Sequence, residues 1–527
     1  MNGLRAVLEK RGWIAPTVVL AAFLVIGIVS SRDYGIAWDE PVQRQYGSEV
    51  YNFAVHRDQG LFLDRHRYYG PVFEMLLFSL EKGLHLDDSR AIYLMRHLVN
   101  FLVLWVGIVF FYKLVRYLLG NAWLALLACA MLFLSPRIFA HGFYNTKDIP
   151  FLTMFVIGFY TLLRFLDATT IWRGLAHGIA CAVLVDTRIV GILLIALTVA
   201  ALGYRVARSG RIGQAARKIG PPFGIFVLVW AGLTVLMWPT LWRDPVHNFV
   251  RVFEGMRNFP WEATVLYLGK YIWSTQIPWH YTLVWIAVST PLAFVVMFLI
   301  GLPVSIAASV APGHTPGLLR RRDLVLTLAW FFLPLASSIA SRAVLYDEWR
   351  HSFFVYPALL IVGLVGIVWI RRWIEGTFRG AARKAIKWAV VVLVGANMVG
   401  VATFMIRYHP HENVFFNALT GGLGGANGKF EMDYWGLSYR QGLEYIVRTD
   451  PGNLIPVHAA TAAGRYNADI LKPADRKRLA FVGELADARY HVTTFRWDRE
   501  RFTAGSEAFA IRVEGVPVMA VYRLPSP

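Results

Sequence analysis

Long apolar stretches recur through the first 406 residues of the chain, separated by polar segments. A helix needs about 20 apolar residues to cross the hydrocarbon core of a bilayer, and most of the stretches approach that length. The pattern therefore predicts an α-helical polytopic membrane protein with about 11 transmembrane helices. The predicted spans lie at 13–30, 97–118, 122–138, 150–166, 174–186, 188–204, 222–240, 282–309, 324–340, 353–370 and 388–406.

The region 174–204 can be divided in two ways, because Asp186 and Arg188 interrupt it near its middle. It is either one over-long helix or two short ones. Basic residues favour the cytoplasmic side of a membrane, and both the N-terminus and the segment 205–218 are basic. Alternating crossings place the segment 167–173 on that side as well. The chain must therefore cross the membrane an even number of times between 167–173 and 205–218. We therefore expect a helical hairpin whose tip, "DTR", lies at the outer face, and a C-terminus outside the cytoplasm.

Two long outer loops have the composition of a membrane interface. The loop 31–96 contains apolar residues at helical spacing, which predicts an amphipathic helix along the membrane surface. These residues are Val72, Phe73, Leu76, Leu77 and Leu80. The loop 241–281 holds tryptophans of the kind that form aromatic belts in membrane proteins, namely Trp242, Trp261, Trp273 and Trp279.

The last part of the chain has the composition of a soluble domain. It carries a helix pattern near 439–448 and strand patterns near 454–459, 489–495 and 509–523. We expect a transmembrane region, 1–406, and a small C-terminal α/β domain outside the cytoplasm, 407–527.

Composition supports the membrane class and gives the charge a simple explanation. Charged residues make up 17% of the chain, against about 25% in soluble domains, and 56% of the residues are hydrophobic. The net charge is +19, but the basic residues lie mostly in short loops, where the positive-inside rule explains them without nucleic acid. Cys129 and Cys181 lie inside apolar stretches, so we expect them to be packing residues. The first stretch lacks a small-residue cleavage site, so we expect it to be retained.

Two adjacent acids follow the first predicted span, in the sequence "WDEP". Asp39 can cap a helix that has Pro41 in its first turn, beside Trp38 as an interfacial anchor. On the outer face, Asp39 and Glu40 would also meet a lipid headgroup. A carboxylate there can accept a proton from a hydroxyl or bind a divalent cation. The two interpretations are compatible.

A second acid lies between the third and fourth predicted spans, in "FAHGFYNTKDIPF". Alternation of the crossings puts this residue, Asp148, on the same side of the membrane as Asp39. Pro150 follows closely, so a capping role is again an alternative. Lys147 adds a positive charge beside the acid.

Carboxylates near a histidine can also bind a divalent cation, and the candidates here are Asp39, Glu40, Asp148 and His141. Their spacing is not diagnostic of any metal. A histidine at a helix end is more often structural than a ligand, so the sequence leaves the metal open.

Cations occur close to the expected membrane boundary at two further places. Arg188 lies with Asp186 at the predicted hairpin tip, where an ionisable group is costly and indicates function. The alternative is an ion pair between these two residues that only ties the turn. Arg350 opens the stretch "RHSFFVYP" before a late span, where an arginine can also simply extend toward the headgroups.

The Asp-Glu pair after the first span, the second acid after the third span and the "RHSFFVYP" stretch together resemble the GT-C superfamily of integral-membrane glycosyltransferases. The likeness extends over 1–406 and is strongest over 31–200. It favours the branch of protein O-mannosyltransferases and aminoarabinose transferases. The resemblance implies a polyprenyl-phosphate sugar as the donor substrate.

The resemblance also implies roles for single residues. Asp39, together with Glu40, would take the place of the first-loop acid, which is the proposed base or metal-associated residue, and Asp148 that of the second-loop acid. Basic residues hold the lipid phosphate in that branch, and the candidates here are Arg188, Lys147 and Arg350. The tail motif "DYWG" departs in order from the Trp-Trp-Asp motif of oligosaccharyltransferases, which argues against transfer of a whole oligosaccharide to asparagine.

These observations predict a glycosyltransferase, of enzyme class 2.4, that moves a sugar from a polyprenyl-phosphate donor to an acceptor hydroxyl at the outer face, with inversion. The expected partners are the donor, the bilayer and a glycan, lipid or protein acceptor, and the expected location is the cell inner membrane. A polytopic transporter is the alternative, although the chain shows no internal repeat and its acids lie in outer loops. A scaffold that displays the tail would leave those acids with capping roles only.

Overall fold

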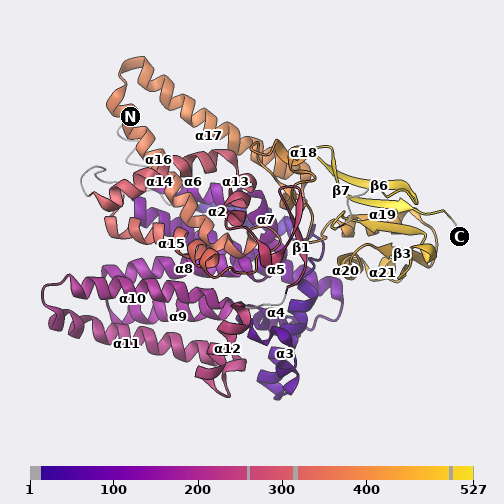
Figure 1. The fold of residues 1–527 in the computed structure, drawn as a ribbon, viewed down its shortest axis with the longest axis horizontal. Helices are drawn as coiled ribbons and strands as arrows, with labels where there is room; N and C mark the ends of the chain where they lie inside the picture. Colours follow the sequence, from indigo (N-terminus) through magenta and orange to yellow (C-terminus); the bar gives the residue numbers. More distant parts are fainter. Residues whose placement is uncertain (1–13, 258–260, 312–318, 498–501, 526–527) are drawn as a thin grey trace.

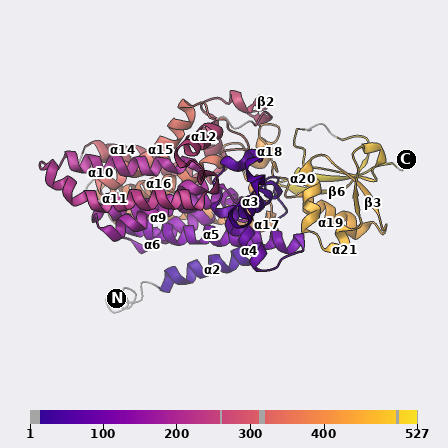
Figure 2. The ribbon, with the colours of Figure 1, turned by 90° about the horizontal axis from the view of Figure 1, so that it is seen from below.

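The computed structural model describes residues 14–257, 261–311, 319–497 and 502–525. Long helices lie side by side in one body, and a small mixed sheet lies at one end of it (Figure 1). Figure 2 shows α3 and α4 at the end of the helical body that faces the sheet, whereas the turn between α10 and α11 lies at the opposite end.

The helical part of the chain contains the elements α2 (Ile14–Ser30), α3 (Glu40–His56), α4 (Val72–Gly83), α5 (Ser89–Leu119), α6 (Ala122–Phe133), α7 (Pro136–Tyr144), α8 (Asp148–Asp167), α9 (Ile171–Thr187), α10 (Ile192–Ala207), α11 (Ile212–Met237), α12 (Pro245–Arg257), α13 (Tyr281–Ser289), α14 (Leu292–Val310), α15 (Arg321–Ala340), α16 (Tyr356–Thr377) and α17 (Gly380–Tyr408). A hairpin of β1 (Thr264–Tyr267) and β2 (Lys270–Trp273) lies between α12 and α13. The short 3-10 helices used below are η3 (Ile189–Gly191) and η6 (Arg350–Val355).

Among the described residues, eight helices are long and apolar enough to cross a membrane, or nine if α6 and α7, which are bent by 68°, form one broken span. Helices cover most of every predicted range, and Trp13 lies outside the described residues. The predicted polytopic membrane fold is therefore confirmed. The prediction counts two further helices, α2 and α9, each of which is described over 17 residues; α2 begins where the described residues begin.

The region 174–204 forms two helices, as predicted. α9 ends before Arg188, whose backbone is extended, and α10 begins after η3. Arg188 lies 2.5 Å from Asp148 at the first residue of α8, and Arg205 donates a hydrogen bond to the carbonyl of Leu166 near the last. The chain therefore reverses at Arg188, and the hairpin tip lies at the same end of the bundle as the start of α8.

The loop 31–96 contains the predicted helix, α4, and packs onto the bundle. The buried carboxylate of Glu74 on α4 lies 2.6 Å from Arg96 of α5. Just before α4, a Cβ atom on Gly70 would lie 1.8 Å from the carbonyl oxygen of Asp186, so only glycine permits this approach to the hairpin tip. The loop is thus fixed at the end of the bundle where Arg188 lies.

The C-terminal part forms a five-stranded sheet in the order β4-β3-β5-β7-β6, which confirms the predicted small α/β fold. β3 runs parallel to β4 and β5, whereas β7 runs antiparallel to β5 and β6. The elements are α18 (Gly422–Ala426), α19 (Tyr439–Thr449), β3 (Ile455–Ala459), α20 (Ala462–Tyr466), α21 (Pro473–Arg476), β4 (Leu479–Phe481), β5 (Tyr490–Thr493), β6 (Ser506–Val513) and β7 (Val516–Arg523).

The segment between α17 and α19 packs into the helical body. Phe415, Phe416 and Trp435 belong to the buried apolar cluster of the bundle, whereas α19 and the sheet have a cluster of their own. Asn467, close to α20, exchanges hydrogen bonds of 2.9 Å with both the N–H and the carbonyl of Ile36. The tail therefore holds the segment that leads to Asp39.

Candidate active site

Segments that are far apart in the sequence meet at one end of the bundle. Asp39 precedes α3, Lys147 and Asp148 begin α8, Arg188 forms the hairpin tip, and Arg350 begins η6. Arg350 lies 3.3 Å from Asp39 and 3.6 Å from Asp148. Arg188 lies 2.5 Å from Asp148, and the Lys147 ammonium lies 3.9 Å from Asp39. The structure thus brings these sequence-predicted site residues together.

Asp39 is the accessible acid of this group. Its side chain is 33% exposed, whereas that of Asp148 is 2% exposed. Asp39 occupies the N-cap of α3, but its carboxylate makes no capping hydrogen bond with the described residues, so the capping explanation is wrong. Burial acts to raise the pKa of Asp39, but nearby cations, chiefly Lys147 and Arg350, bring the pKa below its usual value. Asp39 is therefore an ionised carboxylate that is partly accessible to solvent.

Asp148 is enclosed and fixed on several sides. Asn145 donates a hydrogen bond of 2.8 Å to its carboxylate and accepts one of 2.9 Å from its backbone N–H, so Asn145 supplies the cap of α8. Arg188 and Arg350 both contact the same carboxylate. The suggested ion pair between Asp186 and Arg188 is absent from the described part of the chain, because Arg188 pairs with Asp148 instead. The geometry makes Asp148 a fixed partner for two guanidinium groups.

Lys147 is a cation whose charge depends on its surroundings. Burial lowers its pKa to about 8, because the favourable effect of Asp39 only partly offsets burial and the repulsion of Arg350 and Arg188. The ammonium lies 4.2 Å from the centre of the Tyr69 ring. An anion placed beside Lys147 would favour its protonated form.

Two charged residues that the sequence analysis did not identify complete the site. Asp347 lies 3.8 Å from Arg350, and Arg496 lies 2.8 Å from Asp347. Asp347 stands close in sequence to Arg350, and that proximity was a usable signal. Arg496 follows β5 in the tail, where charged residues are common, so nothing in the sequence marked it. We call the set Asp39, Lys147, Asp148, Arg188, Asp347, Arg350 and Arg496 the charged cluster.

The charged cluster borders a cavity of about 190 Å³, the inner cavity. Asp39, Lys147, Asp347 and Arg496 line it directly, and His66 also faces it. The rest of its wall is largely aromatic and consists of Trp38, Tyr69, Trp261, Tyr346, Trp435 and Trp497, with Val42, Gln43 and Ala263. The guanidinium of Arg350 lies 4.6 Å from the centre of the Trp435 ring, so it lies next to this wall.

Two predicted site residues have other partners. Glu40 is buried, accepts a hydrogen bond of 2.8 Å from the backbone N–H of Ala37, and lies 3.2 Å from His97. His141 is buried 3.1 Å from Glu348. Within the described ranges, no group of three or more His, Cys, Asp and Glu side chains could hold a metal ion. Glu40 and His141 are held by these partners and do not join Asp39 and Asp148 in such a group.

The arrangement suits the binding of a small anion next to a base. Four cationic side chains face three carboxylates in the charged cluster, which leaves one positive charge in excess. Cations in a partly buried site stabilise negative charge that develops on a leaving group. The ionised, accessible Asp39 carboxylate can accept a proton from a hydroxyl in the inner cavity.

The sequence matches the family model of dolichyl-phosphate-mannose-protein mannosyltransferases over residues 42–216. This range includes Lys147, Asp148 and Arg188, but begins after Asp39. A comparison with curated proteins found no match. The family match confirms the predicted resemblance to membrane glycosyltransferases.

Solved structures of membrane glycosyltransferases resemble this chain. ArnT from Cupriavidus metallidurans, in the apo state, aligns over 97% of this chain and 98% of its own, with 14% identity and a TM-score of 0.52. The apo oligosaccharyltransferase of Archaeoglobus fulgidus covers 90% of this chain and 69% of its own, with 9% identity and a TM-score of 0.48. Oligosaccharyltransferase AglB of the same archaeon, in complex with an inhibitory peptide and a dolichol-phosphate, also aligns over 90% of this chain and 69% of its own. Its identity is 10% and its TM-score is 0.46. The first of these confirms the fold.

Proposed function

We propose that this chain, a membrane glycosyltransferase of the GT-C type similar to the protein mannosyltransferases, transfers one sugar from a polyprenyl-phosphate donor to an acceptor hydroxyl. One observation carries the proposal: the accessible, ionised Asp39 lines an aromatic cavity and shares the Arg350 guanidinium with the buried Asp148. The candidate base, Asp39, therefore lies within a few ångströms of the candidate phosphate-binding residues Arg350 and Lys147.

The donor phosphate would bind to the cations of the charged cluster. Arg188, Lys147 and Arg350 are the phosphate-binding candidates, and Asp148 holds both guanidinium groups in position. A guanidinium is suited to bidentate contact with a phosphate. The excess positive charge of the cluster matches the single negative charge of a phosphodiester. Binding of this anion would also keep Lys147 protonated, because the phosphate offsets the effect of burial on its pKa.

Binding of the phosphate would activate Asp39. In the free protein Arg350 and Lys147 lower the basicity of this carboxylate. A phosphate that draws both cations toward itself restores that basicity at the moment the donor is in place. The acceptor oxygen then attacks the anomeric carbon, its proton passes to Asp39, and the bond between the sugar carbon and the phosphate oxygen breaks with its electron pair on the phosphate. A single displacement of this kind inverts the configuration at the sugar carbon.

The reaction would take place at the non-cytoplasmic face of the cell inner membrane. Basic residues gather at the opposite end of the bundle, where Arg320 and Arg322 lie 2.8 and 2.9 Å from Asp167. The positive-inside rule assigns that end to the cytoplasm. The tail 407–527 would then form an extracytoplasmic domain next to the transmembrane region 1–406, and the acceptor would be a glycan, a lipid or a protein on that side.

The test is a turnover assay with the purified full chain in nanodiscs. The chain is incubated with radiolabelled polyprenyl-phosphate sugars and an envelope fraction from cells that lack its gene. We expect released polyprenyl phosphate and labelled acceptor. Uptake of a solute into sealed vesicles without cleavage of any donor would contradict the proposal and favour a transporter.

A further inference from the structure

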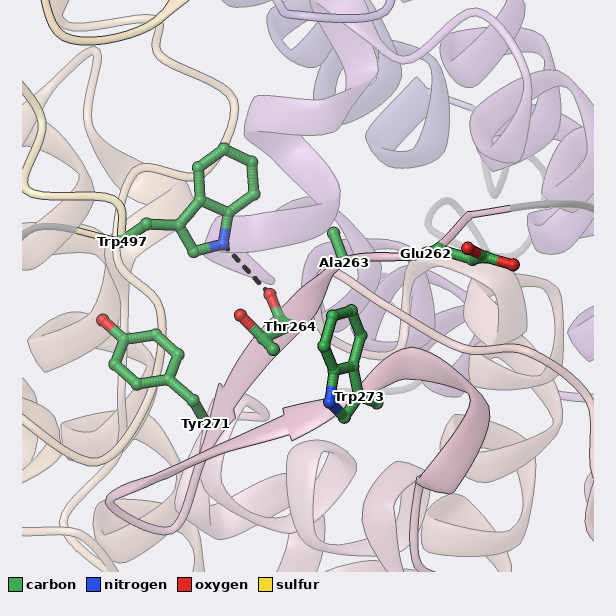
Figure 3. Close-up of a pocket in the computed structure, with 6 residues that line it drawn as sticks. All are labelled: Glu262, Ala263, Thr264, Tyr271, Trp273 and Trp497. Carbon is green, nitrogen blue, oxygen red and sulfur yellow. Dashed lines mark hydrogen bonds between the residues drawn. The ribbon is translucent and has the colours of Figure 1, made fainter.

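A second, more open pocket lies on the outer side of the inner cavity. It has a volume of about 400 Å³ and is lined by Glu262, Ala263, Thr264, Tyr271, Trp273 and Trp497. We call it the outer pocket. Figure 3 shows the rings of Trp497, Tyr271 and Trp273 arranged around its opening, with Thr264 between them and Glu262 at one edge. Five of its residues come from the β1–β2 hairpin and the segment that leads into it, whereas Trp497 comes from the tail.

The aromatic rings of the outer pocket are accessible yet held in place. Tyr271, Trp273 and Trp497 are 45%, 52% and 42% exposed. Trp273 pairs with Thr264 across the hairpin ladder, and Tyr271 pairs with Leu266. Trp497 donates a hydrogen bond of 3.0 Å from Nε1 to the carbonyl of Thr264. Large apolar rings that are fixed while still facing solvent indicate a binding surface.

The outer pocket adjoins the candidate active site. Ala263 and Trp497 line both the outer pocket and the inner cavity. The guanidinium of Arg496, a member of the charged cluster, lies 4.4 Å from the centre of the Trp497 ring. Trp497 therefore stands at the boundary between the outer pocket and the cavity that Asp39 lines.

The lining of the outer pocket combines flat apolar faces with hydrogen-bonding groups at its edges. A sugar ring presents C–H groups on its faces and hydroxyl groups around its edge. The faces can pack on aromatic rings. The hydroxyl groups of Thr264 and Tyr271 and the carboxylate of Glu262 can bond to the hydroxyls at the edge.

We propose that the outer pocket binds a sugar residue of the acceptor, so that the acceptor of this enzyme is a carbohydrate. This inference rests on the proposed function, because it extends the acceptor side of the same site. The hydroxyl that receives the new sugar lies in the inner cavity near Asp39, and the neighbouring sugar of the acceptor packs between Trp273 and Trp497.

The first experiment identifies the chemical class of the acceptor. The envelope fraction of cells that lack the gene is divided into three parts: one untreated, one digested with a broad protease, and one oxidised with periodate, which cleaves sugars with neighbouring hydroxyls. Reagents are removed before donor and enzyme are added. Transfer should survive the protease and be lost after periodate. Loss after protease with survival after periodate would overturn the inference in favour of a peptide acceptor.

The second experiment assigns binding to the outer pocket. Trp273→Ala removes one ring of the pocket, and Trp279→Ala is the matched control, because Trp279 is a 66% exposed tryptophan of the same loop that lies outside both pockets. We expect Trp273→Ala to raise the KM for the untreated envelope fraction about ten-fold, which corresponds to the loss of one favourable stacking contact, with little change in kcat. Trp279→Ala should leave both constants unchanged.

The outcomes separate this inference from the proposed function. Equal KM values for the two variants would show that Trp273 is only an interfacial anchor, and would overturn the outer pocket while donor cleavage continued to support the glycosyltransferase. Tyr271→Ala serves as a second variant if Trp273→Ala is recovered in poor yield. Absence of polyprenyl phosphate release from wild type would instead contradict the proposed function itself.

Discussion

Arg350 donates a hydrogen bond to Asp39 over 3.3 Å, although the two residues are 311 positions apart in the sequence. The same guanidinium lies 3.6 Å from Asp148. A single arginine thus joins the segment before α3, the start of α8 and the start of η6. Its position between two carboxylates gives a phosphate a direct way to change the basicity of Asp39, because an anion that attracts Arg350 weakens its hold on that carboxylate.

We predict that Asp39→Asn lowers turnover by about 10²–10⁴-fold, the usual contribution of a positioned general base. Binding of polyprenyl phosphate should become tighter, because Arg350 and Lys147 no longer have this carboxylate as a competing partner. Turnover and the Kd for radiolabelled polyprenyl phosphate are measured on the same nanodisc preparation. Turnover close to that of wild type would show that another group accepts the proton.

The neighbouring acid should behave differently. Glu40 accepts a hydrogen bond from the N–H of Ala37 and lies beside His97, so its contacts are structural. We predict that Glu40→Gln lowers the free energy of unfolding by about 1–3 kcal/mol, the range for a buried charged hydrogen bond, while kcat changes less than about ten-fold. Thermal unfolding and turnover are compared with those of Asp39→Asn. A loss of turnover as large as that of Asp39→Asn, without a loss of stability, would make Glu40 part of the chemistry.

We predict that kcat/KM for the donor falls as the pH rises above about 8, because the pKa of Lys147 is about 8 in the free protein and only its protonated form attracts the phosphate. Lys147→Arg should remove this decline, since arginine stays charged at such pH values. The pH profiles of kcat/KM are measured for both proteins between pH 6 and pH 9.5. Identical declines in the two profiles would mean that Lys147 does not control donor capture.

The sequence predicts those site residues that interrupt or end a long apolar stretch with a charge. Asp39, Asp148 and Arg188 are ionisable residues at the ends of apolar stretches, where a charge is costly unless it has a function or a partner. Arg496 breaks no pattern, because the tail is rich in charged residues. Its pairing with Asp347 depends on how the tail docks against the bundle, which no local spacing encodes.

In the fold, too, local sequence patterns predict some features, and tertiary contacts decide the others. Apolar length located the membrane helices, including α2 and α9, which are described over only 17 residues each. The tryptophans of the loop 241–281 predict an interfacial belt. The structure adds that Trp273 pairs with Thr264 in a two-stranded hairpin, and that Trp497 from the tail closes the pocket beside it. Composition predicts that such rings lie near an interface, whereas only the tertiary contacts show what they surround.

The ion pair between Arg188 and Asp148 should support the fold as well as the site. Arg188→Gln removes the closer cation from a carboxylate that is 2% exposed. We predict a loss of about 3 kcal/mol in the free energy of unfolding, at the low end for a broken buried pair because Arg350 remains nearby. The double variant Arg188→Gln with Asp148→Asn should recover most of the thermal stability, although not the turnover. A double variant that is as unstable as the single one would show that charge pairing is not the cause.

His409 should make the stability of the protein depend on pH. Its ring lies 2.7 Å from Glu412 and 3.0 Å from Asp33. Burial acts to lower its pKa, but these two carboxylates raise the pKa to about 9. The folded protein therefore binds this proton more tightly than the unfolded chain does, whose histidine pKa is about 6.5. The stabilisation is complete below pH 6.5 and is lost as the pH rises through about 9.

The comparison that tests this linkage is wild type against His409→Gln. We predict that wild type has the higher Tm at pH 6 and that the difference shrinks steadily up to pH 9.5, because at high pH both proteins carry a neutral side chain at this position. Lys147 titrates in the same range in both proteins, so its contribution cancels in the difference. A Tm difference that stays constant across the range would mean that the His409 side chain acts by packing and not by its charge.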